Sequence, residues 1–216
     1  MVSLTLLRRQ MEYTELIRNR GWDTLPGNIR SLYGCRITVL GTGDIGTQFA
    51  RRARAFSPAK IVGVRRSAKP GDPAFDEIRA NAELDAILPE TDLLVMALPN
   101  TPDTAGTLSR ERMALLPKGA LVVNVGRGTA VDQDALIDAL NSGHLGGAAL
   151  DVVVPEPLPA DHPLRDAKNI LLTPHVAGNT TLPYTQQRTL DMFFEDLDNY
   201  VAGKPLKHAV DRKKFY

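Results

Sequence analysis

The sequence is poor in cysteine and histidine and carries almost no net charge. Its 216 residues include one cysteine, Cys35, so neither an internal disulfide nor a multi-thiolate metal site can form. The four histidines show no short ligand spacing, and we therefore expect no metal site; they are His144, His162, His175 and His208. The net charge of +1 gives no electrostatic support for binding to nucleic acid or to an anionic membrane.

Long apolar runs are absent as well. No run approaches the roughly 20 residues that cross a bilayer. The short apolar stretch after Met1 is followed, rather than preceded, by Arg8 and Arg9, which is the wrong polarity for a secretory signal. With the single cysteine, this predicts a cytoplasmic protein with no membrane partner. A composition of 43% hydrophobic and 24% charged residues is typical of a soluble globular protein of one large domain, or one domain with extensions.

Short apolar runs rich in β-branched residues alternate with helical patterns through the middle of the chain. Several of these runs are continuously apolar, which indicates strands buried on both faces, as in a parallel sheet covered by helices. Alternation of strands and helices with short links predicts an α/β, doubly wound Rossmann fold. The predicted strands cover residues 36–40, 60–64, 92–97, 120–125, 147–152 and 169–173, and the predicted helices between them cover 44–56, 83–88, 109–115 and 132–142.

A glycine turn follows the first predicted strand. The segment Gly41-Thr42-Gly43-Asp44-Ile45-Gly46 has the spacing G-x-G-x-x-G between a buried strand and a helix. In a dinucleotide-binding fold the first glycine permits the tight turn, the second lets the backbone approach the pyrophosphate, and the third allows close helix–strand packing. The sequence therefore predicts a nicotinamide-dinucleotide site here. The alternative is a structural turn that binds no ligand.

Amphipathic helices flank this region on both sides. Apolar residues recur at helical spacing over residues 4–20 and again over 184–202. We accordingly expect an N-terminal helix and linker at 1–33, an NAD(P)-binding Rossmann domain at 34–180, and a C-terminal helix and tail at 181–216.

Two arginines stand where the second predicted strand ends. An acidic residue at this place would bind the ribose hydroxyls of NAD and repel a 2′-phosphate. Arg65 and Arg66 would instead attract that phosphate, which favours NADP(H) over NAD(H). The alternative is that the two arginines only solvate a loop.

Three chemically capable side chains each follow a later predicted strand. Arg127 follows the fourth strand, Glu156 the fifth and His175 the sixth. Because the carboxyl ends of parallel strands face the binding crevice, the three could converge beside the nicotinamide. Each has a structural alternative: Arg127 could cap a helix or pair with Asp132, Glu156 could be an exposed loop residue, and His175 could be a structural hydrogen-bonding group.

Four segments together resemble the D-isomer-specific 2-hydroxyacid dehydrogenase family. They are the glycine turn, Val-Gly-Arg-Gly at 125–128, Asp-Val-Val-Val-Pro-Glu-Pro at 151–157 and Thr-Pro-His-Val-Ala-Gly at 173–178, in the family's order and spacing. The segment Gly-Val-Arg-Arg-Ser at 63–67 is similar to that of glyoxylate/hydroxypyruvate reductases and related NADPH enzymes. The resemblance implies an NAD(P)H-dependent oxidoreductase that reduces small 2-oxo acids to 2-hydroxy acids.

The resemblance also implies a role for each candidate residue. His175 would give a proton to the carbonyl oxygen during reduction, Glu156 would orient and charge the imidazole, and Arg127 would bind the substrate carboxylate. The cofactor pocket would include the glycine turn, the two arginines and a further set from the later loops, namely Leu98, Pro99, Thr104, Val125, Gly126, Arg127, Asp151, His175, Ala177 and Gly178.

The chain departs from the family at its start. Family members usually carry a substrate-binding domain of roughly a hundred residues before the helix that here covers 4–20. Three explanations stay open: a truncated or wrongly started reading of a longer enzyme, a natural remnant, or a cleft completed by a separate chain. In the family this helix also contributes to a two-fold interface, which predicts a homodimer. The alternative function is a truncated, catalytically silent dinucleotide-binding or interaction module.

Overall fold

The chain forms two compact units. The computed structural model describes residues 1–27, 29–67, 71–178 and 182–210. The first unit is Met1–Pro174 and the second is His175–Tyr216. The boundary expected between residues 180 and 181 lies outside the described residues.

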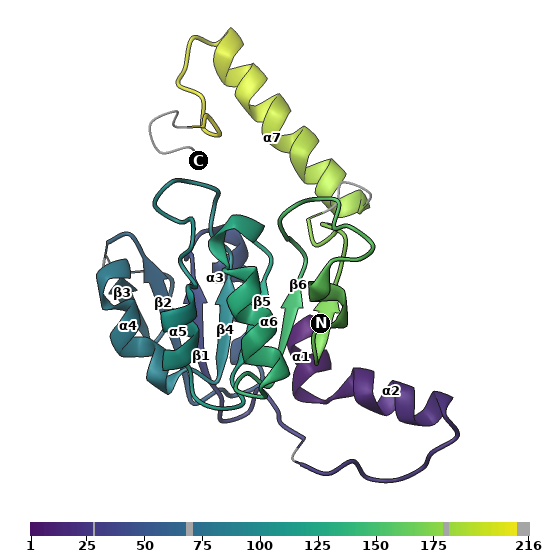
Figure 1. The fold of residues 1–216 in the computed structure, drawn as a ribbon. Coiled ribbons are helices and arrows are strands. Elements are labelled where there is room, and N and C mark those ends of the chain that lie inside the picture. Colours follow the sequence, from purple (N-terminus) through teal and green to yellow (C-terminus); the bar gives the residue numbers. More distant parts are fainter. Residues whose placement is uncertain (28, 68–70, 179–181, 211–216) are drawn as a thin grey trace. The chain divides into compact units, whose positions relative to one another are not determined.

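The described part of the first unit is built on a seven-stranded parallel sheet (Figure 1). The strand order is β3-β2-β1-β4-β5-β6-β7. Successive strands are added on one side of β1 as far as β3, and from β4 onward on its other side. This is the doubly wound Rossmann arrangement, which confirms the predicted fold class. The strands are β1 (Arg36–Leu40), β2 (Lys60–Arg65), β3 (Glu77–Ala80), β4 (Leu93–Met96), β5 (Leu121–Asn124), β6 (Gly147–Leu150) and β7 (Ile170–Leu172).

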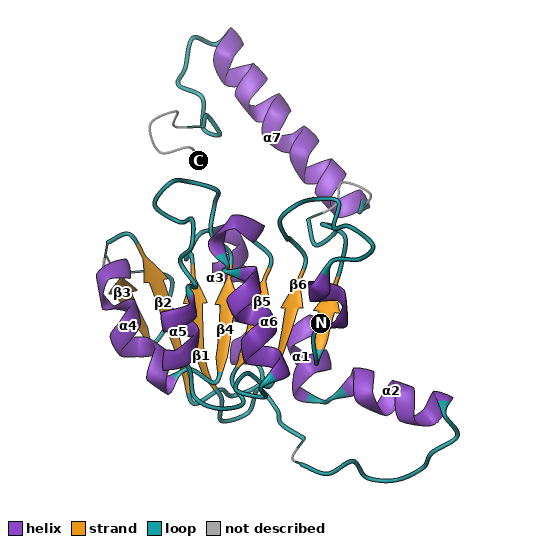
Figure 2. Cartoon of the chain, in the orientation of Figure 1, coloured by secondary structure: helices purple, strands orange, loops and turns teal. Residues whose placement is uncertain are grey.

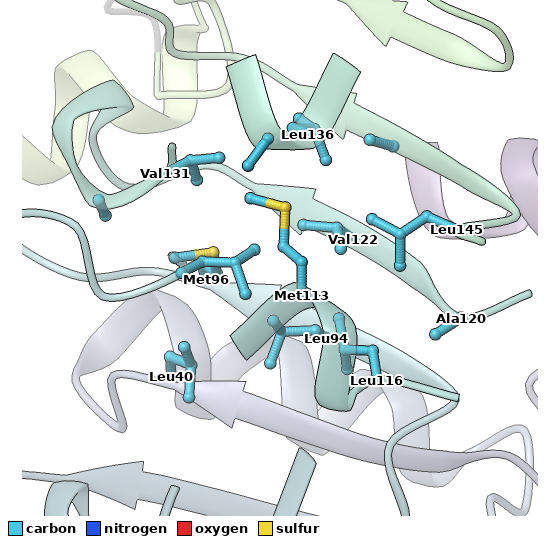
Figure 3. Packing of buried hydrophobic residues seen from close by; sticks show 14 of the residues in the cluster. Leu40, Leu94, Met96, Met113, Leu116, Ala120, Val122, Val131, Leu136 and Leu145 are labelled. Atoms are coloured by element: carbon cyan, nitrogen blue, oxygen red, sulfur yellow. The ribbon is translucent and has the colours of Figure 1, made fainter. Parts of the chain in front are cut away.

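Side chains of the central strands alternate between two separate apolar cores. Val95 of β4 packs with the core on one face of the sheet, whereas Leu94 and Met96 pack with the core on the other face (Figure 3). Both faces are covered, which explains why these strands are continuously apolar rather than alternating.

Helices cover both faces of this sheet (Figure 2). Leu6 and Leu7 of the first helix join one core, and Leu136 and Leu140 of a later helix join the other. The α-helices of the first unit are α1 (Val2–Leu7), α2 (Gln10–Arg18), α3 (Asp44–Arg54), α4 (Leu84–Ile87), α5 (Arg110–Leu115) and α6 (Gln133–Asn141), and single 3₁₀ turns occupy Asn81–Glu83, Leu88–Glu90, Gly128–Ala130 and Pro163–Asp166.

The prediction of one helix over residues 4–20 is wrong. The helix breaks after Leu7, and Arg9 adopts a left-handed conformation with φ of 53°. The Arg9 guanidinium pairs with Glu12 and donates a hydrogen bond to the carbonyl of Pro26 at 2.5 Å. Since the contact with Pro26 joins residues 17 positions apart, the spacing of apolar residues alone could not indicate the break.

The second unit consists mainly of one long helix, α7 (Pro183–Val201), which agrees with the predicted helix over 184–202. Proline at its first position has the fixed φ that a helix start accepts. Glu195 accepts hydrogen bonds from Lys207 and His208, so the segment after the helix is tied back to it. None of the helices in the described residues is both long and apolar enough to cross a membrane.

Candidate active site at the carboxyl edge of the sheet

The glycine turn joins β1 to α3 through two close backbone approaches. Gly41 has φ of +94°, and a Cβ there would lie 2.5 Å from the carbonyl oxygen of Ala97. A Cβ on Gly46 would lie only 1.9 Å from the carbonyl oxygen of Gly41. Both positions therefore require glycine, one for its backbone conformation and both for space. The turn holds the start of α3 tightly against the end of β1.

The middle glycine of the turn has a different environment. A Cβ on Gly43 would meet no atom within 4 Å, and its φ of −74° is accessible to any residue. Gly43 is the N-cap of α3, and the next residues, Asp44 and Ile45, are exposed, while Thr42 before it is half-buried. The backbone N–H groups at this helix start are thus next to open space, where an anion could approach them.

Arg65 and Arg66 lie beside the turn. Leu40 is opposite Val64 in the parallel pair, and the Gly41 N–H donates to the carbonyl of Val64 at 2.9 Å. The turn and Arg65 therefore begin at the same level of adjacent strands. Arg65 is half-buried and Arg66 is exposed.

The loop after β4 is held together by one threonine. The Thr104 hydroxyl donates to the carbonyl of Pro99 at 2.6 Å and accepts from the backbone N–H of Thr101 at 3.0 Å. Thr104 is 9% exposed and Leu98 is 8% exposed. These contacts give Thr104 a part in shaping the loop; its contact with a cofactor stays a prediction.

A buried amide lies under the loop that carries Arg127. Asn124 ends β5 and is 1% exposed. Its side chain binds the backbone of both Gly126 and Arg127, and the Arg127 guanidinium donates to the carbonyl of Gly126 at 2.7 Å. Sequence reasoning did not single out Asn124, although a polar residue inside the apolar run 120–125 was a usable signal. Val125, which follows it, is half-buried.

The loop after β6 carries Asp151 and Glu156. Asp151 is 6% exposed and accepts a hydrogen bond from the hydroxyl of Thr173. A carboxylate oxygen of Glu156 accepts from the backbone N–H of Val153 at 3.0 Å, so this side chain turns back along its own loop. The side chain of Gln133, at the start of α6, binds both the N–H and the carbonyl of Val154, which fixes the loop from the other side.

The loops that carry Arg127 and Glu156 are neighbours. Strands β5 and β6 pair along their length, with Asn124 opposite Leu150. A Cβ on Gly128 would lie 2.4 Å from the carbonyl of Val153, so the two loops pass each other at backbone distance. The structure thus brings two of the three candidate catalytic residues to adjoining parts of one edge.

His175 is the first residue of the second unit. Its backbone is left-handed, with φ of 54°, a conformation that is uncommon among residues other than glycine but that histidine, asparagine and aspartate adopt more often than most. Ala177 and Gly178 follow it and are exposed.

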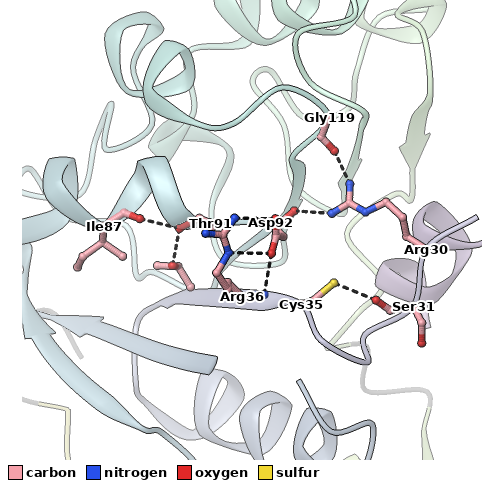
Figure 4. Close-up of polar contacts among 9 residues, drawn as sticks. Arg30, Ser31, Cys35, Arg36, Ile87, Thr91, Asp92 and Gly119 are labelled. Atoms are coloured by element: carbon pink, nitrogen blue, oxygen red, sulfur yellow. Dashed lines mark hydrogen bonds and ion pairs between the residues drawn. The ribbon is translucent and has the colours of Figure 1, made fainter. Parts of the chain in front are cut away.

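The opposite edge of the sheet holds a polar cluster with a structural character (Figure 4). Burial acts to raise the pKa of Asp92, but hydrogen bonds from the side chain and backbone of Arg36 outweigh it and hold that pKa below its ordinary value. Arg30 donates to the carbonyl of Gly119 at 2.6 Å. Burial raises the pKa of the Cys35 thiol, which donates to the carbonyl of Ser31, so the sulfur has no thiolate character.

Residues 1–177 match the family described as D-isomer specific 2-hydroxyacid dehydrogenase, NAD binding domain. The chain belongs to this family. The match covers the whole sheet and every motif on which the resemblance rests, except the final residue Gly178, so the recognition from sequence is confirmed.

Named relatives point to one group within the family. Glyoxylate/hydroxypyruvate reductase B of Pectobacterium carotovorum is 34% identical over 207 residues, which cover 93% of this chain and 62% of the relative. Glyoxylate reductase/hydroxypyruvate reductase of Mus musculus is 32% identical and covers 93% of this chain and 60% of the relative. The chain therefore spans about three fifths of the length of these curated relatives.

Solved structures agree with this placement. The NADPH-dependent glyoxylate/hydroxypyruvate reductase of Sinorhizobium meliloti, solved with NADP and sulfate, is 31% identical with a TM-score of 0.89 and covers all of this chain and 67% of that one. A D-isomer specific 2-hydroxyacid dehydrogenase of Xanthobacter autotrophicus, solved with NADPH and MES, is 33% identical with a TM-score of 0.84, covering 99% and 85%.

Proposed function

We propose that this chain provides the cofactor-binding half of an NAD(P)H-dependent oxidoreductase that reduces small 2-oxo acids, such as glyoxylate or hydroxypyruvate, to 2-hydroxy acids. The main support is the arrangement of groups at the carboxyl edge of the sheet. The start of α3 at Gly43 has open space beside it, and the neighbouring loops that carry Arg127 and Glu156 belong to the same unit. Membership of the family and the activities for which the relatives are named support this reaction class.

The cofactor site fits a dinucleotide at its pyrophosphate. A Cβ on Gly43 would meet nothing within 4 Å, so a pyrophosphate could approach the N–H groups at the start of α3, and a bound nicotinamide cofactor would supply the hydride. Arg65 and Arg66 end β2 and follow it beside the turn, from where they could bind a 2′-phosphate, and the Sinorhizobium and Xanthobacter proteins were solved with NADP or NADPH. We therefore propose NADPH as the preferred donor.

Three residues of this chain would act on the substrate. The planar guanidinium of Arg127 would bind the carboxylate of the 2-oxo acid and polarise its carbonyl. The imidazolium of His175 would give its proton to the carbonyl oxygen as the hydride arrives at the carbon. As the family resemblance implies, we propose Glu156 as the residue that orients the imidazole of His175. In the oxidative direction His175 would accept the proton.

The partners and location of the protein are part of the same proposal. Helix α2 buries none of its residues, and the segment after it exposes Trp22 at 88%, while Ile17 is 49% exposed. Apolar side chains so exposed are typical of an interface, and we propose a homodimer through this arm, in the cytoplasm. Light scattering behind a sizing column would give the mass of one chain if this is wrong.

Turnover tests the proposed reaction directly. The purified chain, mixed with NADPH and glyoxylate or hydroxypyruvate, is expected to lose absorbance in the nicotinamide band. His175→Gln is expected to cut the rate by about 10²–10⁴-fold, because proton transfer by a positioned side chain contributes that much. His144→Gln is the matched control, because His144 contacts the carbonyl of Met113 at the other edge of the sheet. It should keep the wild-type rate.

The same turnover assay tests the alternative function that the sequence left open. A catalytically silent dinucleotide-binding or interaction module would bind NADPH and show no turnover with either acid. That result would refute the reductase proposal for this chain and support the alternative. Turnover that His175→Gln abolishes would exclude it.

A further inference from the structure

Asn124 is a polar residue at the end of an otherwise apolar strand, β5. The loop that carries the candidate catalytic residue Arg127 begins directly after it. Asn124 is the last residue of β5, and only 1% of its surface is exposed. An amide buried this deeply costs free energy unless its donor and acceptor are both used. The candidate mechanism assigns it no role, so its bonding partners are informative.

Both ends of the Asn124 amide bind the loop that follows. The side-chain oxygen accepts from the N–H of Gly126 at 3.0 Å, and the side-chain nitrogen donates to the carbonyl of Arg127 at 2.9 Å. One side chain thus holds the backbone on both sides of the Gly126–Arg127 peptide. The backbone carbonyl of Asn124 also accepts from the N–H of Asp151 at 3.0 Å, which ties this loop to the next one.

The neighbouring backbone leaves the turn little freedom. A Cβ on Gly126 would lie 2.6 Å from both the nitrogen and the oxygen of Leu98, and one on Gly128 would lie 2.4 Å from Val153. The loop therefore runs between the loops after β4 and β6 at backbone contact. Inside this narrow passage, the Asn124 side chain bonds to the Gly126 N–H and to the Arg127 carbonyl, which restrains the directions of these two groups.

The same loop backbone also contacts the guanidinium of Arg127. The carbonyl of Gly126 accepts a hydrogen bond from the Arg127 guanidinium at 2.7 Å. The direction of that carbonyl is set by the peptide that follows Gly126, whose flanks Asn124 holds. We propose that Asn124 is a positioning residue that sets the direction of the Arg127 side chain toward the substrate carboxylate. This inference rests on the proposed function of Arg127.

Replacing the amide by a carboxylate tests the donor alone. Asn124→Asp keeps the shape and the acceptor for the Gly126 N–H, but it places an oxygen opposite the carbonyl of Arg127, which that oxygen repels. Misplacement of a substrate-binding group by about 1 Å can cost on the order of 10²-fold. We expect kcat/KM for glyoxylate to fall about 10–100-fold, mostly through KM, with the KM for NADPH within about twofold.

The matched control is Asn141→Asp, at the end of α6. Asn141 uses only its side-chain oxygen, which accepts from the N–H of Lys168 at 3.1 Å, and an aspartate retains that bond. It adds the same charge and should leave the KM for glyoxylate unchanged. Thermal melting of both variants checks the fold. Calorimetric titration of glyoxylate into the NADP⁺-loaded chain gives the affinity without turnover.

A double-mutant cycle decides between positioning and a general structural role. If Asn124 acts through Arg127, Asn124→Asp on an Arg127→Ala background will cost little beyond the loss from Arg127→Ala alone. Losses that multiply, or a wild-type KM in Asn124→Asp, would overturn the positioning role while Arg127→Ala still supports the proposed function. An unaffected Arg127→Ala, or a wild type without turnover or glyoxylate affinity, would overturn both.

Discussion

Two glycines of one turn, Gly43 and Gly46, are expected to respond in opposite ways to the same substitution. A Cβ on Gly46 would lie 1.9 Å from the carbonyl oxygen of Gly41, which is at least 1.1 Å closer than the 3.0 Å that real Cβ atoms keep. A Cβ on Gly43 would meet nothing within 4 Å. Alanine at residue 46 must therefore push α3 off the end of β1, whereas alanine at residue 43 fits the free protein.

The magnitudes follow from the surroundings of each position. Forcing an atom into a packed site costs about 1–3 kcal/mol, and exchanging glycine for alanine inside a helix returns up to about 1 kcal/mol. Gly46→Ala should thus destabilise by about 1–2 kcal/mol, or about 2–8 °C in Tm for a chain of this size. At Gly43, a poorer N-cap costs about 0.5–1 kcal/mol and a stiffer unfolded chain returns about as much. Its Tm should stay within about 2 °C.

Measuring NADPH binding distinguishes a glycine turn that binds the cofactor from a turn with only a structural role. If the pyrophosphate lies against Gly43, the added methyl group occupies its place, and the Kd for NADPH should rise about 10–100-fold in Gly43→Ala. Fluorescence titration measures the Kd, and calorimetry the Tm. A Gly43→Ala variant that binds NADPH as tightly as the wild type would show that no phosphate approaches this residue. A Gly46→Ala variant with an unchanged Tm would refute the packing argument.

Three further outcomes are expected. Arg65→Ala should reduce the preference for NADPH over NADH by about tenfold or more in paired titrations, because a charge-assisted bond to the 2′-phosphate is lost; equal losses for both cofactors would contradict this. Asp92→Asn should lower the stability by about 1–2 kcal/mol at pH 7, measured by urea unfolding. Because the pKa of Asp92 is depressed by Arg36, its contribution is present above about pH 4 and is lost as the pH falls through that pKa, so the two proteins should converge in acid. Hydrogen bonds from Lys207, then His208, hold the pKa of Glu195 at about 2; Lys207→Ala should raise it in an NMR titration, and an unchanged value would exclude the contact.

The fold could be predicted because burial on both faces left a direct trace in the sequence. The central strands β1, β4 and β5 lie between two cores; β4 is apolar throughout, and the other two are apolar except at Arg36, Thr38 and Asn124. The glycines at 41 and 46 were predicted for reasons that the structure bears out, a tight turn and close helix–strand packing.

Two elements left no comparable trace. Strand β3 contains one large apolar residue, Ile78, between Glu77 and Arg79. It lies at the edge of the sheet, and none of its four residues is fully buried. Its sequence therefore resembles a loop. The break between α1 and α2 depends on Arg9 and its contact with Pro26, and periodicity reports only the face that a residue occupies. The other edge strand, β7, is the apolar run Ile-Leu-Leu and was predicted, so β3 was missed because of its polar sequence rather than its edge position.

The candidate site divides along the same line. Arg127 and Glu156 were found because each follows a strand, and chain order alone places the ends of parallel strands at one edge. The side chains that hold their loops, Asn124 and Gln133, follow no such rule, because what defines them is the backbone groups they meet after folding. A sequence motif indicates which residues could contact a ligand. The amide side chains of Asn124 and Gln133 bond to the backbone of the loops that carry those residues. Substitutions at Asn124 and Gln133 should therefore change the KM for the substrate even though every residue of the motifs is retained. The effect depends on the hydrogen bonds that these amides make to the loops of the folded protein.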